Sequence, residues 1–180
     1  MRLFAALDLP LDVRTTLGAW AASAVGRDER LRLVDEQSLH VTLVFLGERP
    51  DAGAAGTALE SALDPSPPAP PLTVDGPLWL SPRRPHVLTV ALEDPSEGLA
   101  RIQAAVLDAM VRSAEHEAEG RAFRPHVTVA RVRGRLRPFE LPAPPVLAFH
   151  PPAVTLYRSV LGSGPATYEP VTSVPLSTLP

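Results

Sequence analysis

The chain of 180 residues has no cysteine, no lysine and no asparagine. Without cysteine there can be no disulfide, no thiolate nucleophile and no cysteine-ligated zinc or iron–sulfur site. All 17 basic residues are arginines, which together with 22 prolines indicates a GC-rich genome rather than a function. The net charge of −3 does not fit a protein that coats nucleic acid non-specifically, because such proteins are strongly basic.

Long apolar runs are also missing. The opening residues 1–8 hold too short an apolar run for a signal peptide, and no later run is long enough to cross a membrane. We therefore expect a cytoplasmic protein without membrane contact. The chain also lacks the Gly-x-Ser-x-Gly turn of serine hydrolases and the Gly-x-x-x-x-Gly-Lys loop that cradles nucleotide phosphates.

The most informative feature is a short phrase, His-x-Thr-x, that occurs at residues 40–43 and again at 126–129. Both copies lie in β-branched, aliphatic stretches that are typical of strands, where alternate side chains share a face. His40 and Thr42 are therefore expected on one face, and His126 and Thr128 repeat the arrangement. The opposite, apolar face of the first strand is expected to carry Val41, Leu43 and Phe45.

The hydrophobic periodicities predict three helices, which begin at Pro10, near residue 52 and at Asp94. Strands are predicted at 2–7, 38–46, 72–80, 86–92, 123–133, 152–160 and 166–173, with a turn at residues 162–164. This order lacks the regular βαβ alternation of a parallel sheet, so the expected class is α+β. Because the two phrases lie 86 residues apart, we expect two related lobes that face each other.

The residue types of the two phrases suit phosphoryl chemistry without a metal. Two histidines can hold one neutral and one protonated ring at once, as concerted acid–base catalysis requires. Threonine hydroxyls and arginine suit phosphate oxygens. Six arginines fall within seventeen residues around the second phrase, and this local positive field indicates an anionic substrate. They are Arg121, Arg124, Arg131, Arg133, Arg135 and Arg137.

A plainer interpretation exists for several of these residues. Arg133, Arg135 and Arg137 fit a solvated edge that prevents aggregation as well as they fit a functional surface. In an unbroken strand Arg131 lies on the face opposite His126, so it reaches the site only if the strand ends or bulges. The remaining histidines are interpreted as structural or surface residues: His86, His116 and His150.

A zinc site is the main alternative to metal-free acid–base catalysis, since histidine is the commonest ligand of zinc. A zinc site needs three or four ligands, and neither phrase carries a carboxylate near its histidine. The threonine partner has no role as a zinc ligand. We therefore expect no metal at the site and no cofactor.

Four blocks of the chain, in order, resemble the 2H phosphoesterases, and in detail their RNA 2′,3′-cyclic phosphodiesterase branch, the LigT-like or 2′-5′ RNA ligase-like proteins. The blocks are residues 2–10, 39–47, 123–131, and 156–162 with 168–170. The resemblance implies a bilobal α+β fold in which two antiparallel sheets with flanking helices form a central cleft. It makes residues 1–180 a single 2H phosphoesterase domain of two pseudo-symmetric lobes.

The resemblance also implies a reaction, the hydrolysis of a ribose 2′,3′-cyclic phosphate to a 2′-phosphomonoester. It implies that His40 is the general acid and His126 the general base, an assignment that the symmetry of the two phrases leaves open. Thr42, Thr128 and Arg131 would bind the phosphate. The family often carries an aromatic residue in the strand that corresponds to 86–92, and its absence here leaves Phe4 as the candidate nucleobase contact.

The implied substrates are RNA ends or cyclic nucleotides, acted on by a monomer without a protein partner. The reverse reaction, joining RNA ends through a 2′-5′ linkage, belongs to the same class. A non-catalytic module that binds RNA or nucleotides through its arginines is the alternative, disfavoured by the two intact phrases. A scaffold for a partner protein would leave the duplicated phrase unexplained.

Overall fold

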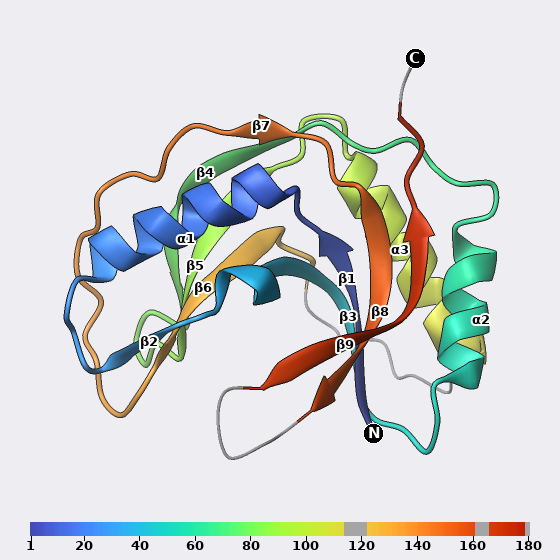
Figure 1. Ribbon diagram of the computed structural model, residues 1–180, viewed down its shortest axis with the longest axis horizontal. Helices are drawn as coiled ribbons and strands as arrows, with labels where there is room; N and C mark the ends of the chain where they lie inside the picture. Colours follow the sequence, from blue (N-terminus) through green and yellow to red (C-terminus); the bar gives the residue numbers. More distant parts are fainter. Residues whose placement is uncertain (114–121, 161–165, 179–180) are drawn as a thin grey trace.

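In the computed structural model, which describes residues 1–113, 122–160 and 166–178, two antiparallel sheets carry three helices (Figure 1). The α+β, bilobal class expected from the sequence is therefore confirmed. The predictions for His116, Arg121 and the turn at 162–164 lie outside the described residues. No helix in the described part of the chain is long and apolar enough to cross a membrane.

The first sheet has the strand order β3-β1-β8-β9. Its strands are β1 (Arg2–Asp8), β3 (His40–Glu48), β8 (Ala153–Val160) and β9 (Thr167–Pro175). Strand β1 is almost wholly apolar and pairs with β3 on one side and β8 on the other, so it forms the centre of this sheet. Strand β3, which carries the first His-x-Thr phrase, lies at the edge.

The second sheet has the order β2-β6-β5-β4-β7. Its strands are β2 (Leu31–Leu33), β4 (Leu72–Leu80), β5 (Val87–Glu93), β6 (His126–Val132) and β7 (Ala148–Phe149). The second phrase opens β6, which is flanked by β2 and β5. The sequence does not predict β2 and β7, because two or three residues are too few to show a periodicity.

The helices cover the outer faces of the sheets, and two of them cross from one sheet to the other (Figure 1). Helix α1 (Leu11–Val25) follows β1 but packs on β2 and β6 of the second sheet. Helix α3 (Gly98–Ser113) follows β5 of the second sheet but packs on β3 of the first and on α2 (Gly53–Ala62). A single cluster of buried apolar residues runs through both halves.

All three helices begin within a few residues of the predicted positions. The stripe predicted for α3 is buried, since Leu99, Ile102, Val106 and Met110 are at most 4 % exposed. Helix α3 begins at Gly98 rather than at the predicted cap, yet the Asp94 Oδ2 still accepts a hydrogen bond from the Ala100 N–H. A short carboxylate side chain can thus satisfy a free amide at a helix start from outside the helix.

Candidate active site

The two His-x-Thr phrases meet where the sheets adjoin, because β3 at the edge of the first sheet lies against β6 of the second. Two cavities open at this junction. The first, of about 650 Å³, is lined by His40, Arg131 and Tyr168 among others. The second, of about 620 Å³, is lined by His126, Gln103 and Arg124 among others. Thr42 and Phe45 line both cavities, which are therefore adjacent.

Both histidines are held by the same backbone device. The Nδ1 of His40 lies 2.7 Å from the carbonyl oxygen of Ser38, and the Nδ1 of His126 lies 2.6 Å from that of Arg124. Because a carbonyl oxygen only accepts, each Nδ1 carries its proton and donates it. The Nε2 atoms are therefore left to exchange protons, and the Nε2 of His40 lies 3.1 Å from the Thr42 hydroxyl.

His40 lies in an aromatic surround. The ring centroids of Phe4 and Tyr168 lie 5.0 and 5.3 Å from the imidazole centroid, and that of Tyr157 lies at 6.5 Å. Burial is the main reason why the pKa of His40 falls from 6.5 to about 4. The hydrogen bond to Ser38 acts in the opposite direction, and the positive charges of Arg131 and His126 lower the pKa further. His40 is therefore neutral at pH 7 in the free protein.

Arg131 lies on the same side of β6 as the histidine, contrary to the parity of an unbroken strand. Opposite Ala130 and Thr128, the partner residues on β5 are the neighbours Leu88 and Thr89, so β6 holds one extra residue, Val129. This β-bulge buries Val129 and Ala130 in succession and turns Arg131 outward. The condition under which Arg131 could reach the site is thus met, and Arg131 lines the cavity of His40.

Strand β3 has the same bulge at the same place in its phrase. Val44 and Thr42 face the consecutive residues Ala5 and Ala6 of β1, and Leu43 is the extra residue. The expectation that Phe45 shares the buried face is therefore wrong, because the bulge changes the alternation: Phe45 is 39 % exposed and lines both cavities. Phe45 occupies the place in the first phrase that Arg131 occupies in the second.

The other predicted site residues are placed as follows. Thr128 is half-buried on the His126 face of β6, opposite Thr89. Phe4 lines the first cavity but is only 4 % exposed, because its ring packs against His40, Tyr157 and Tyr168. A contact between Phe4 and a nucleobase stays a prediction. The surface assignment of His86 and His150 agrees with their exposure.

The sequence does not single out several residues at this junction. Arg32 of β2 pairs with Arg131 of β6 and lines the first cavity with Arg2, whose guanidinium lies 4.8 Å from the centre of the Phe45 ring. Nothing in the sequence reports these contacts, since β2 is too short to be recognised. Tyr157 and Tyr168 belong to the last block of the family resemblance, which is the available signal for them.

A half-buried carboxyl group lies beside the site. Asp8 is the partner of His40 in the pairing of β1 with β3, and its oxygens accept hydrogen bonds of 2.8 Å from the hydroxyls of Thr155 and Tyr157. Burial raises the pKa of Asp8 despite these bonds and the nearby charge of Arg14. Burial and the Asp8 charge also raise the pKa of Tyr157, so its hydroxyl stays a donor that braces the carboxyl. In the described parts of the chain, no three His, Asp or Glu side chains gather as metal ligands would.

Comparison with known proteins gives one consistent result. Residues 10–159 match the 2′-5′ RNA ligase superfamily. The RNA 2′,3′-cyclic phosphodiesterase of Escherichia coli K12 is 28 % identical over 171 residues, which cover 94 % of this chain and 93 % of the relative. The crystal structure of E. coli LigT complexed with 3′-AMP superposes with a TM-score of 0.81 at 30 % identity, and that of TT0787 from Thermus thermophilus with 0.81 at 25 %; each pair covers 98 % of both chains.

Proposed function

The chain belongs to the 2′-5′ RNA ligase superfamily, and on that premise we propose that it hydrolyses the 2′,3′-cyclic phosphate of RNA or of a nucleotide to a 2′-phosphomonoester without a metal. The observation that carries the proposal is the matched placement of the two histidines. Each imidazole is held at Nδ1 by a backbone carbonyl two residues upstream, and each phrase faces the same junction of the sheets. The curated relative named as a cyclic phosphodiesterase supports the substrate class.

The reaction proceeds by in-line displacement at phosphorus. His126 takes a proton from water through its Nε2 as the oxygen of that water bonds to phosphorus. The bond from phosphorus to O3′ breaks, and the protonated Nε2 of His40 gives its proton to O3′. The products are a 3′-hydroxyl and a 2′-phosphomonoester. The acid and base assignment follows the family. If the 5′-hydroxyl of a second RNA attacks phosphorus in place of water, it gives its proton to His126, O3′ leaves with the proton of His40, and the two RNA ends are joined through a 2′-5′ linkage.

The remaining groups bind and orient the phosphate. Thr42 and Thr128 donate hydroxyl hydrogen bonds to its non-bridging oxygens, and the Arg131 guanidinium offsets the charge that develops on them. Phe45, which is exposed and lines both cavities, offers an apolar ring to the nucleoside, while Phe4 and Tyr168 fix the plane of the His40 ring. Phe45 is more exposed than Phe4 and is therefore the more accessible candidate for a contact with a nucleobase.

The experiment is hydrolysis of adenosine 2′,3′-cyclic phosphate in excess EDTA, with the product identified as the 2′- or 3′-phosphate. Turnover to the 2′-phosphate is expected, and replacing His40 or His126 with alanine should lower kcat at least ~100-fold, the lower range for positioned acid–base catalysis. Arg101→Gln, on an exposed position of α3, is the control. Full activity of either histidine variant would contradict the proposal.

The alternative, a module that binds nucleotides without turning them over, predicts a different result. Such a module would keep its affinity for 2′-AMP after His40 or His126 is replaced with alanine. Its wild-type form would show no hydrolysis. A monomeric state and a cytoplasmic location are part of the same proposal.

A further inference from the structure

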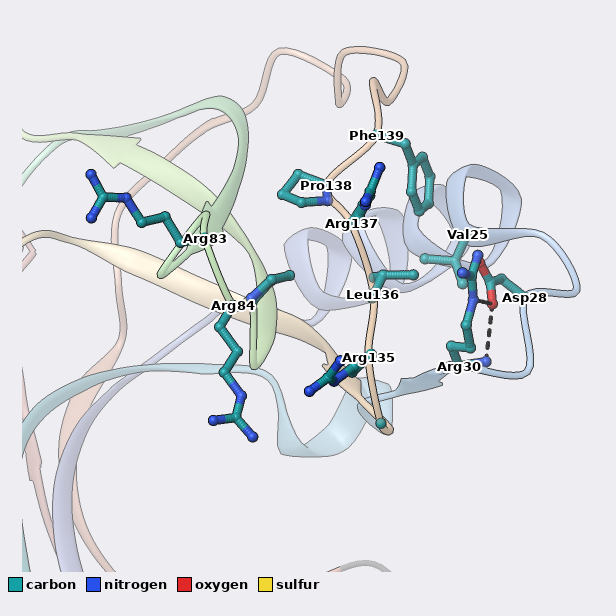
Figure 2. A pocket seen from close by; sticks show the side chains of 12 residues that line it. Val25, Asp28, Arg30, Arg83, Arg84, Arg135, Leu136, Arg137, Pro138 and Phe139 are labelled. Carbon is teal, nitrogen blue, oxygen red and sulfur yellow. Dashed lines mark hydrogen bonds and ion pairs between the residues drawn. The ribbon is translucent and has the colours of Figure 1, made fainter.

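A second kind of cavity, whose lining includes neither His40 nor His126, lies at the far end of the second sheet, and Figure 2 shows it from close by. It has a volume of about 1060 Å³ and is formed by three segments: the link from α1 to β2, the turn from β4 to β5, and the chain that follows β6. We call it the arginine pocket. Its charged lining residues are Asp28, Arg30, Arg83, Arg84, Arg135 and Arg137.

The charge of this pocket is strongly positive in a protein of net charge −3. Asp28 is its one carboxylate among the described residues, and both Asp28 oxygens are occupied by Arg30, at 2.9 Å from Nε and 2.7 Å from a terminal nitrogen. Four guanidinium groups remain. All four are exposed, and within the described residues none of them forms an ion pair or a side-chain hydrogen bond. Unpaired guanidinium groups around one cavity are a site for several phosphates.

The arginines that line the cavity belong to two segments on opposite sides of it, and in Figure 2 the Arg83 side chain extends away from the opposite segment. Arg83 and Arg84 extend from the β4–β5 turn, and Arg135 and Arg137 from the segment across the cavity. That segment has no regular secondary structure but is anchored. Leu136 is buried, and the indole N–H of Trp79 donates a hydrogen bond of 3.1 Å to the carbonyl oxygen of Phe139. The segment that carries Arg135 and Arg137 is therefore held against the second sheet.

An aromatic ring lies among the arginines. Phe139 lines the pocket beside Arg137, is 37 % exposed, and rests on Trp79 with the ring centroids 5.3 Å apart. Exposed aromatic rings between basic side chains are the pattern with which proteins bind single-stranded nucleic acid, stacking bases on the rings and pairing phosphates with the charges. A pocket for a small inorganic anion would have no use for this ring.

Strand β6 connects the arginine pocket to the active site. It runs from His126 to Val132, seven residues and roughly 20 Å at the usual strand rise. Arginines accompany it: Arg32 pairs with Arg131 beside His40, and the Arg133 N–H donates a 2.7 Å hydrogen bond to the Arg30 carbonyl at the next step toward the pocket. A single-stranded RNA that spans this distance needs about six nucleotides at a stacked spacing of ~3.4 Å.

We propose that the arginine pocket binds the phosphodiester backbone of a single-stranded RNA whose 3′ end lies between the two histidines. The inference rests on the proposed function for the position of the 3′ end. It makes an RNA strand, rather than a free cyclic nucleotide, the preferred substrate. It also assigns a use to the basic segment after β6, which the sequence alone leaves divided between a solvated edge and a functional surface.

Direct binding tests the inference without any turnover. The probe is a fluorescent ten-nucleotide single-stranded RNA with a 3′-hydroxyl, titrated with protein between about 50 and 200 mM salt. The double variant Arg84→Gln, Arg135→Gln should bind it at least tenfold more weakly. Its salt dependence should be shallower by about 1.4 in log K against log salt, two contacts at ~0.7 each. Phe139→Leu should lower the affinity about fivefold or more with an unchanged slope.

Controls separate the pocket from net charge and from folding. Arg101→Gln removes a positive charge from α3, on the other side of the molecule, and should bind like the wild type (Figure 1). The unfolding midpoints of all the variants should agree within a few degrees. Equal affinity of the double variant and the wild type would overturn the inference, and so would equal affinity for the single strand and a duplex of the same length.

Kinetics distinguish a failure of the inference from a failure of the proposed function. On a dinucleotide and a decanucleotide with the same cyclic-phosphate end, the wild-type protein should show a lower KM for the longer substrate, and the double variant should lose this preference. Hydrolysis of both lengths with equal KM refutes the inference alone. No hydrolysis of either, or of adenosine 2′,3′-cyclic phosphate, refutes the proposed function.

Discussion

The ionisation of His40 is the point at which the structure constrains the mechanism most closely. An imidazole with a pKa of about 4 is protonated in about one molecule in a thousand at pH 7. A general acid must carry its proton, so a catalytic role for His40 as acid requires that the substrate raise this pKa. The phosphate supplies the cause, because its negative charge favours the protonated ring and offsets the charge of Arg131.

This argument predicts a ligand-dependent titration. In the free protein the ring proton resonances of His40, assigned by their loss in His40→Gln, should titrate near pH 4. The pKa should rise when 2′-AMP, the expected product, occupies the site. A pH series of NMR spectra with and without 2′-AMP measures both values. If His40 titrates near 6.5 in the free protein, or at the same pH in the complex, this account of its ionisation fails.

Much at the residue scale is visible in the sequence. Period-two alternation predicts that His40 and Thr42 share one face, as do His126 and Thr128, and the burial patterns of β3 and β6 agree with this. The same alternation assigns Phe45 to the wrong face. A bulge breaks the alternation in β3, and no residue type in the sequence indicates this bulge. The contact of Arg32 with the site depends on which strand lies beside β6, and the sequence around residue 31 does not reveal it.

At the scale of elements, the two bulges change which side chains of β3 and β6 face the candidate site. In β3 and in β6 the bulge follows the threonine, buries two successive apolar residues, and turns the next side chain back toward the histidine. The same sequence spacing, His-x-Thr-x-x, thereby contributes three side chains from each strand rather than two. One strand supplies an aromatic ring at the third place and the other an arginine.

The bulge in β6 can be tested through stability. Regular alternation after Val129 would expose Ala130 and bury Arg131, whereas the bulge buries Ala130 completely and exposes Arg131. Ala130→Gln should therefore lower the free energy of unfolding by about 2 kcal/mol or more, since it buries an amide in the core. Arg131→Gln should change it by less than about 0.5 kcal/mol. Urea unfolding of the two variants measures the difference, and the reverse ranking would exclude the bulge.

Elements can be predicted wherever the apolar pattern is long. The three helices and the longer strands lie close to the expected ranges, because each buries a stripe or face of several residues. The strands β2 and β7 hold three and two residues, so their pairing is decided by neighbours that are distant in sequence. The arginine pocket shows the same limit. The basic run after β6 is evident in the sequence, but Arg83 and Arg84 across the cavity come from a turn about fifty residues earlier.

At the scale of the whole molecule, the helices interlock the two halves. Helix α1 leaves the first sheet to cover the second, and α3 leaves the second to cover the first, so each sheet needs a helix that follows a strand of the other. Helix α2 is the exception, because it follows β3 and packs on β8 and β9 of the same sheet, whereas the second sheet is covered by α1, which follows a strand of the first. The prediction that residues 1–180 form one domain of two lobes therefore has a physical consequence, which is that the two sheets should unfold together.

Two natural probes and one buried leucine make this testable. Trp20 in α1 and Trp79 in β4 both belong to the second sheet and its cover, while Leu156 is fully buried in β8 of the first sheet. Leu156→Ala should cost about 3 kcal/mol through lost burial and a residual cavity. If the halves unfold as one, tryptophan fluorescence must report the same lowered urea midpoint as circular dichroism, although neither tryptophan lies on the altered sheet. An unchanged fluorescence midpoint would show that the second sheet is stable by itself. The active site at the junction would then join two independent domains, and its geometry would depend on how they dock.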